Sequence, residues 1–275
     1  MDDISYTAQW TAAARALESE RANAMFRDDY ARHLAEPRGF ELLDRYEGAA
    51  VADFIAVRTR YMDDAITRTL AGTDIRQIVL LANGMDARTY RMDWPDAATV
   101  YEIDHGALLA EKQARLAKLG AVPRVPAVPV GVDLAGDWLG ALKSAGFDSS
   151  RRTLWVAEGL VFFLTEEQVG RLLDTVVGAG PADSWLVVDM TSATLLRHPM
   201  TQSFLRRLRE DGTPWQFGTD QPAEFLADHG WTVRDLRQPG ETGAGEGRWP
   251  YAVAPRETRG VPRNWLISAV AAARG

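Results

Sequence analysis

The sequence predicts an α/β fold in which a mostly parallel sheet is covered by helices on both faces. Three observations support this prediction: short apolar segments recur along the middle of the chain, segments with helical periodicity separate them, and a helical stretch precedes them. Continuous apolar strands are typical of parallel sheets buried between two helical layers. A chain of 275 residues is long enough for one large domain, or for a domain with an added cap.

The beginning of the chain, residues 1–72, is predicted to form a helical cap. The segments "TAAARALESERANAMF" and "VADFIAVRTRYMDDAITRTL" place apolar residues at three- and four-residue steps. This spacing puts the apolar side chains on one face of a helix.

Residues 73–275 are predicted to form a Rossmann-like core. Apolar segments that we expect to be strands lie at residues 76–83, 98–104, 125–134, 153–160 and 184–190. Helical segments at 106–120 and 165–178 alternate with them, and the second begins with a Thr165–Gln168 capping pattern.

The last part of the chain adds a helix at 221–231 and strands at 232–238 and 264–272, joined by a glycine- and proline-rich loop. The segment at about 192–219 interrupts the strand pattern. We expect it to form a helical lid over the ends of the strands.

Composition excludes several classes of protein. The net charge of -7 and the pI near 5.2 disfavour a nucleic-acid partner, because phosphate binding relies on basic surface. The sequence contains no apolar run of the length that a membrane span needs, and its N-terminus is acidic where a secretion signal is basic. We therefore expect a cytoplasmic protein without a membrane partner. With no cysteine and four scattered histidines, we expect no metal site.

Polar residues follow the predicted strands where a ligand would bind. In an open parallel sheet, ligands lie beyond the carboxyl ends of the strands. Gly84 follows the first strand and allows a tight turn, and Asp104 ends the second strand, where an acid accepts hydrogen bonds from ribose hydroxyls. Asp133 and Leu134 offer a polar partner and an apolar wall to an adenine, and Glu158 ends the fourth strand.

The same loops indicate which nucleoside would bind. The segment 82–87 keeps one glycine of the G-x-G-x-x-G pattern that dinucleotide phosphates require, which disfavours a nicotinamide-dependent oxidoreductase. A rim of carboxylates would attract the sulfonium and ammonium groups of S-adenosylmethionine. Its carboxylate would need a cation, for which Arg60 is a candidate, although the same helix offers Arg58 and the residues alone leave the pair open.

Five motifs in order carry a family resemblance: "VRTRYMDD", "LLANGMDARTYRMDWP", "VYEIDHGALLAEK", "VGVDL" and "VAEGLVFFLTEEQVGRLL". Together they resemble the leucine carboxyl methyltransferase family of S-adenosylmethionine-dependent methyltransferases, in its bacterial O-methyltransferase branch. Segments near both ends of the chain are also similar, so the resemblance covers nearly all of it. It implies a class I methyltransferase fold with seven strands, the last antiparallel, and helical additions over the active site.

The resemblance implies a set of cofactor-binding residues. It implies that Arg60 binds the cofactor carboxylate, that Gly84 forms the first loop and that Asp104 binds the ribose. It also implies that the adenine lies by Asp133 and Leu134, and the cofactor amino group near Glu158. Asp86 and Arg88 would brace the loop, and Arg15 would contact the cofactor carboxylate. Relatives commonly carry tyrosine where this chain has Phe163, which puts a shared acceptor in doubt.

The acceptor decides what else the site needs. A carboxylate, with a pKa near 4, is ionised at neutral pH, whereas a phenol, with a pKa near 10, would profit from a general base. Because no convincing base is recognisable, we expect O-methylation of a carboxylate on a small molecule or peptide, by in-line transfer. The alternatives are a hydroxyl of a natural product, or a non-catalytic cofactor-binding protein, and the chain could be a monomer or a homodimer. The acceptor-side candidates are Phe163, Arg197, His198, Arg206 and Tyr251, with Trp215, Phe217, Trp249 and His229 as further possibilities.

Overall fold

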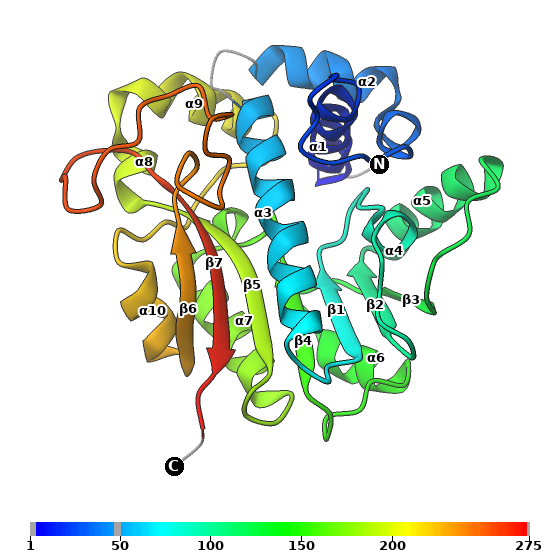
Figure 1. Ribbon diagram of the computed structural model, residues 1–275. Coiled ribbons are helices and arrows are strands. Elements are labelled where there is room, and N and C mark those ends of the chain that lie inside the picture. The colour runs from blue at the N-terminus through cyan, green and yellow to red at the C-terminus, as the bar shows by residue number, and fades with distance from the viewer. Residues whose placement is uncertain (1–3, 47–50, 274–275) are drawn as a thin grey trace.

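Seven strands form one sheet in the computed structural model, which describes residues 4–46 and 51–273 (Figure 1). Residues 1–3 and 47–50 of the predicted cap lie outside the described residues. The strands follow the order β3-β2-β1-β4-β5-β7-β6. They are β1 Gln77–Leu81, β2 Thr99–Asp104, β3 Ala127–Gly131, β4 Thr153–Ala157, β5 Trp185–Thr191, β6 Trp231–Arg237 and β7 Asn264–Ala271.

The direction of the strands matches the sequence prediction. Strands β1 to β5 pair in parallel, and β7 is antiparallel to both of its neighbours, β5 and β6. The order of strands reverses at β1, which pairs with β2 on one side and with β4 on the other. Such a reversal opens a crevice at the carboxyl ends of the strands, and this is where α/β folds bind ligands.

Helices cover both faces of the sheet and lie above the carboxyl ends of its parallel strands. They are α1 Ile4–Ser19, α2 Ala31–Tyr46, α3 Val51–Ala71, α4 Arg88–Arg91, α5 Gly106–Lys118, α6 Trp138–Ser144, α7 Glu166–Gly178, α8 Ala193–Arg197, α9 Gln202–Glu210 and α10 Pro222–Asp228, with short 3-10 turns at Val161–Phe163 and Pro199–Thr201. The predicted capping box of α7 is present, because the Thr165 and Gln168 side chains each accept a hydrogen bond from the other residue's backbone N–H. No helix in the described residues is both long and apolar enough to cross a bilayer.

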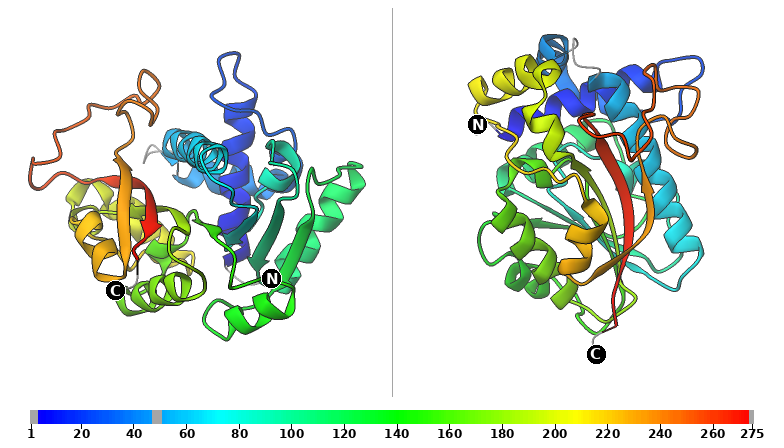
Figure 2. Two further views of the ribbon diagram at one scale, coloured as in Figure 1. Left: turned by 60° about the horizontal axis from the view of Figure 1, so that its bottom comes forward. Right: turned by 90° about the vertical axis from the view of Figure 1, so that its left-hand side faces the viewer.

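Helices cover both faces of the sheet (Figures 1 and 2), and each face carries its own apolar core. Because side chains alternate along a strand, Ile78 and Leu80 of β1 face α3, whereas Val79 and Leu81 face the side covered by α6 and α7. Continuous apolar strands thus follow from burial on both faces, as the sequence predicted.

The cap and the lid pack against each other above the strand ends. Within the predicted lid segment, α8 and α9 contribute Leu195 and Phe204 to a cluster that also holds Trp10 of α1 and Leu34 of α2. Figure 1 shows α9, α1 and α2 at the top of the molecule, around the upper end of α3. The segments that would enclose a ligand are therefore held by one shared apolar cluster.

A buried ion pair connects β2 to α5, and its lysine also contacts the loop after β1. Lys112 of α5 is fully buried, and its Nζ lies 2.8 Å from Glu102 Oε2. Glu102 Oε1 accepts a hydrogen bond from the Thr89 hydroxyl at 2.7 Å, and Lys112 Nζ donates to the carbonyl oxygen of Asp86 at 3.2 Å. Removing one partner of such a pair leaves an uncompensated charge in the interior.

We expect the Lys112→Met substitution to lower the free energy of unfolding by about 3–5 kcal/mol, because Glu102 would remain buried without its cation. The control is Arg152→Ala, which breaks the exposed pair with Asp74 and should cost less than about 1 kcal/mol. Urea unfolding followed by circular dichroism measures both. Equal effects of the two substitutions would contradict the buried pair.

Candidate functional site

A large cleft opens at the carboxyl ends of the parallel strands. It has a volume of about 1190 Å³ and lies between the strand-end loops, the cap, the lid and the loop from β6 to β7. Its lining includes all of the predicted cofactor residues except Arg60: Gly84, Asp104, Asp133, Leu134 and Glu158. The strand tips therefore converge on one space, as the topology requires.

The loop after β1 is shaped by Gly84 and Asp104. Gly84 has a φ of +47°, and a Cβ at this position would lie 3.1 Å from Ala8 Cβ, so glycine serves both the turn and the close approach of α1. Asp104 Oδ2 accepts from the Gly84 N–H at 2.6 Å, and Oδ1 accepts from the His105 N–H at 2.7 Å. The backbone thus fixes the carboxylate, and each of its oxygens keeps lone-pair capacity for a ribose hydroxyl.

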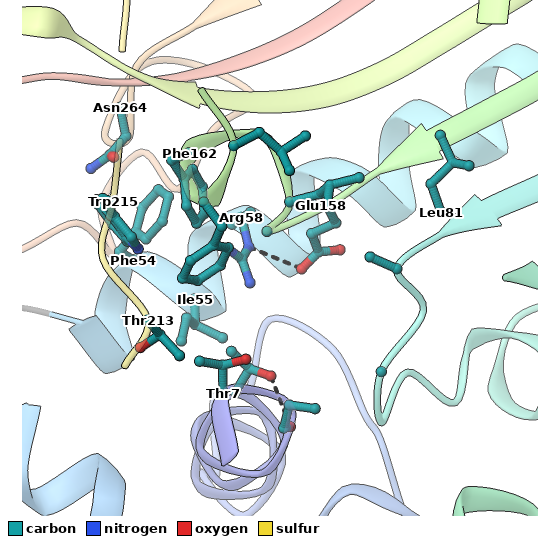
Figure 3. Close-up of a pocket in the computed structure, with 18 of the residues that line it drawn as sticks. Thr7, Phe54, Ile55, Arg58, Leu81, Glu158, Phe162, Thr213, Trp215 and Asn264 are labelled. Carbon is teal, nitrogen blue, oxygen red and sulfur yellow. Dashed lines mark hydrogen bonds and ion pairs between the residues drawn. The ribbon is translucent and has the colours of Figure 1, made fainter. Parts of the chain in front are cut away.

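Glu158 lies between two buried arginines. Arg58 Nε donates to Glu158 Oε1 at 3.0 Å, and Arg58 Nη1 donates to Asp189 Oδ2 at 3.2 Å (Figure 3). Glu158 Oε2 lies 2.6 Å from Arg88 Nη1 but lacks the alignment of a hydrogen bond. Burial raises the pKa of Asp189, although Arg58 and the Gly159 N–H oppose that effect. Glu158 therefore keeps a buried oxygen with unused hydrogen-bonding capacity.

The predicted ion pair between Asp86 and Arg88 is present, with Asp86 Oδ2 2.6 Å from Arg88 Nη1. Burial alone would raise the pKa of Asp86, but the guanidinium groups of Arg88, Arg15 and Arg91 outweigh it and hold the pKa well below its usual range. Arg88 also pairs with Asp63 of α3 at 2.6 Å. The loop after β1 is therefore fastened to α3 by charge.

The prediction for Arg60 is not supported by its position. Arg60 is half exposed, pairs with Asp64 at 2.8 Å and lies outside the cleft lining, whereas Arg58 is buried and lines the cleft. Two residues along a helix differ by about 200° in direction, so the two arginines of "RTR" point to opposite sides. Arg58 takes the place of Arg60 as the candidate cation for the cofactor carboxylate.

Two further candidates for cofactor binding also lie at the cleft. Asp133 and Leu134 line the cleft after β3, with Asp133 exposed and its Oδ1 accepting from the Ala135 N–H at 2.8 Å. Arg15 also lines the cleft, but its guanidinium is occupied by the Met85 carbonyl at 2.6 Å and by Asp28 at 3.3 Å.

The acceptor-side candidates divide into two groups. Phe163 and Tyr251 line the cleft, together with Trp215 and Trp249. The other candidates lie outside its described lining. Arg197 is exposed near Asp220, and Arg206 is also exposed. His198 caps the 3-10 turn through Nδ1, His229 pairs with Asp174, and Phe217 packs in the core against Phe225.

Three residues beside Arg58, two of them aromatic and one an amide, were not anticipated from the sequence. Phe54 of α3, Phe162 of the 3-10 turn after β4 and Asn264 of β7 line the cleft with Trp215 (Figure 3). For Phe54 a signal exists, because it lies one helical turn before Arg58 and therefore shares its face. Phe162 and Asn264 join this group only through the tertiary fold.

The residues of the cleft fit S-adenosylmethionine. Its ammonium suits the unused oxygen of Glu158, and its carboxylate suits the guanidinium of Arg58. Asn83, beside Gly84, carries a buried amide whose nitrogen and oxygen both lack a hydrogen-bond partner in the described structure, which is expected of a group that contacts a ligand. Within residues 4–46 and 51–273, no cluster of three or more potential ligands could hold a metal ion.

Known proteins with similar sequences and folds are methyltransferases. The model of the family named leucine carboxyl methyltransferase matches residues 8–177. A protein of Mycolicibacterium smegmatis, described as S-adenosyl-L-methionine-dependent methyltransferase, is 38% identical over 260 residues, which cover 86% of this chain and 84% of that protein. A protein of Mycobacterium avium with the same description is 36% identical over 274 residues, covering 85% and 86%.

Solved structures show the same fold at low identity. A protein from Thermobifida fusca described as a methyltransferase has a TM-score of 0.66 at 15% identity, covering 97% of this chain and 94% of its own. Magnesium protoporphyrin IX methyltransferase from Synechocystis, with bound S-adenosylhomocysteine, has a TM-score of 0.50 at 14% identity, covering 86% and 95%.

The two arginines of α3 provide a matched test of the site. We expect Arg58→Gln to weaken binding of S-adenosylhomocysteine at least tenfold, because the cofactor carboxylate would lose its cation, and Arg60→Gln to change it less than twofold. Titration calorimetry measures both, with thermal melting as the control for folding. A larger effect at Arg60 would restore the sequence prediction and contradict the structural one.

Asp104 tests the ribose contact. Asp104→Ala should reduce affinity for S-adenosylhomocysteine at least tenfold, about 1.4 kcal/mol, because the hydroxyls would lose their acceptor. The affinity is again measured by calorimetry. Unchanged affinity in a folded variant would remove Asp104 from the binding site.

Proposed function

The chain belongs to the leucine carboxyl methyltransferase family and is an S-adenosyl-L-methionine-dependent methyltransferase, and we propose that it methylates a carboxylate oxygen of a small molecule or peptide. The observation that carries this proposal is the distribution of ionisable groups around the cleft. The residues that would hold the donor are distinct from those that would meet the acceptor.

The half of the cleft at the strand tips is acidic. Asp86, Asp104, Asp133 and Glu158 all follow strands β1 to β4. In our proposal, Asp104 orients the ribose, Glu158 the ammonium and Arg58 the carboxylate of the cofactor. When bound, S-adenosylmethionine supplies a sulfonium methyl group, whose transfer forms an O–C bond as the C–S bond breaks, with the electron pair left on sulfur.

The half of the cleft formed by the cap, the lid and the loop before β7 carries no carboxylate or imidazole among the residues that the structure describes. His105, the one histidine in the described lining, begins α5 beside Asp104 at the strand tips. Tyr251 is half exposed at the cleft and offers a hydroxyl, which is neither a carboxylate nor an imidazole. This half therefore suits an acceptor that needs no deprotonation.

A carboxylate meets that condition. Its ordinary pKa near 4 leaves it ionised at neutral pH, so that transfer releases no proton and requires no base. The task of the protein is then to align the oxygen with the methyl carbon and to exclude water, which aromatic walls from the lid accomplish. A hydroxyl acceptor would require a proton acceptor, which the half of the cleft formed by the cap, the lid and the loop before β7 does not provide among its described residues.

The proposal predicts how the rate depends on pH. With a carboxylic acid as the acceptor, kcat/KM should be nearly constant between pH 6 and 9, because the acceptor is ionised throughout that range and no enzyme base titrates. The measurement is release of S-adenosylhomocysteine from S-adenosylmethionine with 2-naphthoate, and 2-naphthol serves as the matched hydroxyl. Turnover of the naphthol in preference to the acid, or a rate that rises tenfold per pH unit, would contradict carboxylate methylation.

A further inference from the structure

On the side of Arg58 that faces away from Leu81 of β1, one part of the cleft is lined by aromatic side chains (Figure 3). Its walls are Phe54, Phe162 and Trp215, with Thr213 and Asn264 at its edge, and we call this set the acceptor chamber (Figure 3). The residues come from α3, the turn after β4, the segment after α9 and the start of β7. In the figure, Leu81 of β1 lies on the opposite side of Arg58.

Trp215 is fixed in this chamber by other aromatic rings. Its ring centroid lies 4.3 Å from that of Phe162 at 38°, and 5.2 Å from that of Phe204 at 84°. The neighbouring Gln216 N–H donates to the Phe162 carbonyl oxygen at 2.6 Å. Such contacts hold the indole in one orientation, so a ligand that packs against it costs little further side-chain entropy.

The chamber holds two buried polar atoms without partners. Trp215 Nε1 and Asn264 Oδ1 make no hydrogen bond to any described residue, although both side chains line the cleft. Leaving a buried polar group unpaired costs free energy, so such atoms usually await a ligand or water. The indole N–H is only a donor, and the Asn264 amide can offer either its oxygen or its NH₂ after a rotation that exchanges them.

One arginine near the chamber has no carboxylate partner among the described residues. Arg58, at the chamber's boundary, is paired with Glu158 and Asp189, whereas Arg263, the residue before Asn264, also lines the cleft while remaining 92% buried. The Arg263 guanidinium donates to the carbonyl oxygens of Val261, Pro255 and Thr258, and no carboxylate of the described residues lies within 4.0 Å of it. Arg263 therefore secures the loop before β7 and leaves a positive charge that no neighbouring acid neutralises.

We propose that the acceptor is a planar, ring-bearing carboxylate, and that Trp215 and Asn264 determine this specificity. The ring stacks in the space bounded by Trp215, Phe162 and Phe54. The carboxylate oxygen that does not attack the methyl group accepts hydrogen bonds from Trp215 Nε1 and from the Asn264 amide. This inference rests on the proposed function and narrows its substrate from small molecules or peptides in general to aromatic acids.

Binding to the protein saturated with S-adenosylhomocysteine tests the proposal without turnover. The probes for calorimetry are 2-naphthoate, its uncharged amide 2-naphthamide, and the tripeptide Gly-Gly-Leu with a free carboxylate. We expect 2-naphthoate to bind at least tenfold more tightly than the tripeptide. The proposal is overturned if the tripeptide binds as tightly as 2-naphthoate, or if 2-naphthoate fails to bind at millimolar concentration.

Three substitutions test whether Asn264 and Trp215 bind the carboxylate of 2-naphthoate directly or only support the fold. Asn264→Asp adds a negative charge at the carboxylate and should weaken 2-naphthoate at least tenfold while changing 2-naphthamide less than threefold. Gln221→Glu adds the same charge at an exposed position outside the described cleft lining and should change neither. Trp215→Phe keeps a ring but removes the N–H, and should weaken 2-naphthoate at least fivefold.

Binding of S-adenosylhomocysteine to each variant shows that the donor half is intact. An equal loss for the acid and the amide in Asn264→Asp, or unchanged 2-naphthoate binding in Asn264→Asp or Trp215→Phe, would overturn the roles of these residues. These results would leave carboxylate methylation itself standing, whereas preferential turnover of 2-naphthol would remove it.

Discussion

A continuous series of buried ion pairs holds the site together. It begins at Arg15, which pairs with Asp28, and continues through Arg91 to Asp63. From Asp63 it runs through Arg88, Glu158 and Arg58 to Asp189. Asp86 joins it at Arg88. The series connects the segment after α1, helix α3, the loop after β1 and the ends of β4 and β5. Buried charges tolerate little displacement, because each depends on its partners, so these loops keep one relative position.

The composition of this series explains why the site favours a cationic nucleoside. Arg15, Arg58, Arg88 and Arg91 face Asp28, Asp63, Asp86, Glu158 and Asp189, so the carboxylates exceed the guanidiniums by one. Burial raises the pKa of Asp189 at one end, and Glu158 lines the cleft. A ligand that brings an ammonium and a sulfonium adds the missing positive charge, whereas a pyrophosphate would add more negative charge to the same place.

Most of the fold and of the donor half could be predicted from the sequence, because both depend on local patterns. Apolar strands and helical periodicity identify the sheet, and a residue at the end of a parallel strand must lie at its carboxyl edge, which places Gly84, Asp104 and Glu158. Arg58 and Arg60 show where local patterns left a choice open. Both belong to the motif, and the choice between them depends on which face of α3 meets the sheet. The apolar residues at helical spacing from Arg58 could have decided it.

The acceptor half could not be predicted in the same way. Phe54, Phe162, Trp215 and Asn264 are separated by about 50 to 110 residues in the sequence, and no local pattern links them. They meet because the lid packs on the cap and because β7 inserts between β5 and β6. Changes in the lid or in the loop before β7 would therefore alter the acceptor chamber without disturbing the ion pairs at the strand tips.

This separation has a consequence for how specificity can change in such a protein. The donor half is constrained by buried charge, where one substitution leaves another residue uncompensated. The acceptor half is lined mainly by apolar side chains and a few polar atoms, and exchanges among apolar groups of similar volume cost comparatively little. A new acceptor can therefore be accommodated by repacking the walls around Trp215, provided that the walls still supply a donor for the carboxylate and still lack a competing acid.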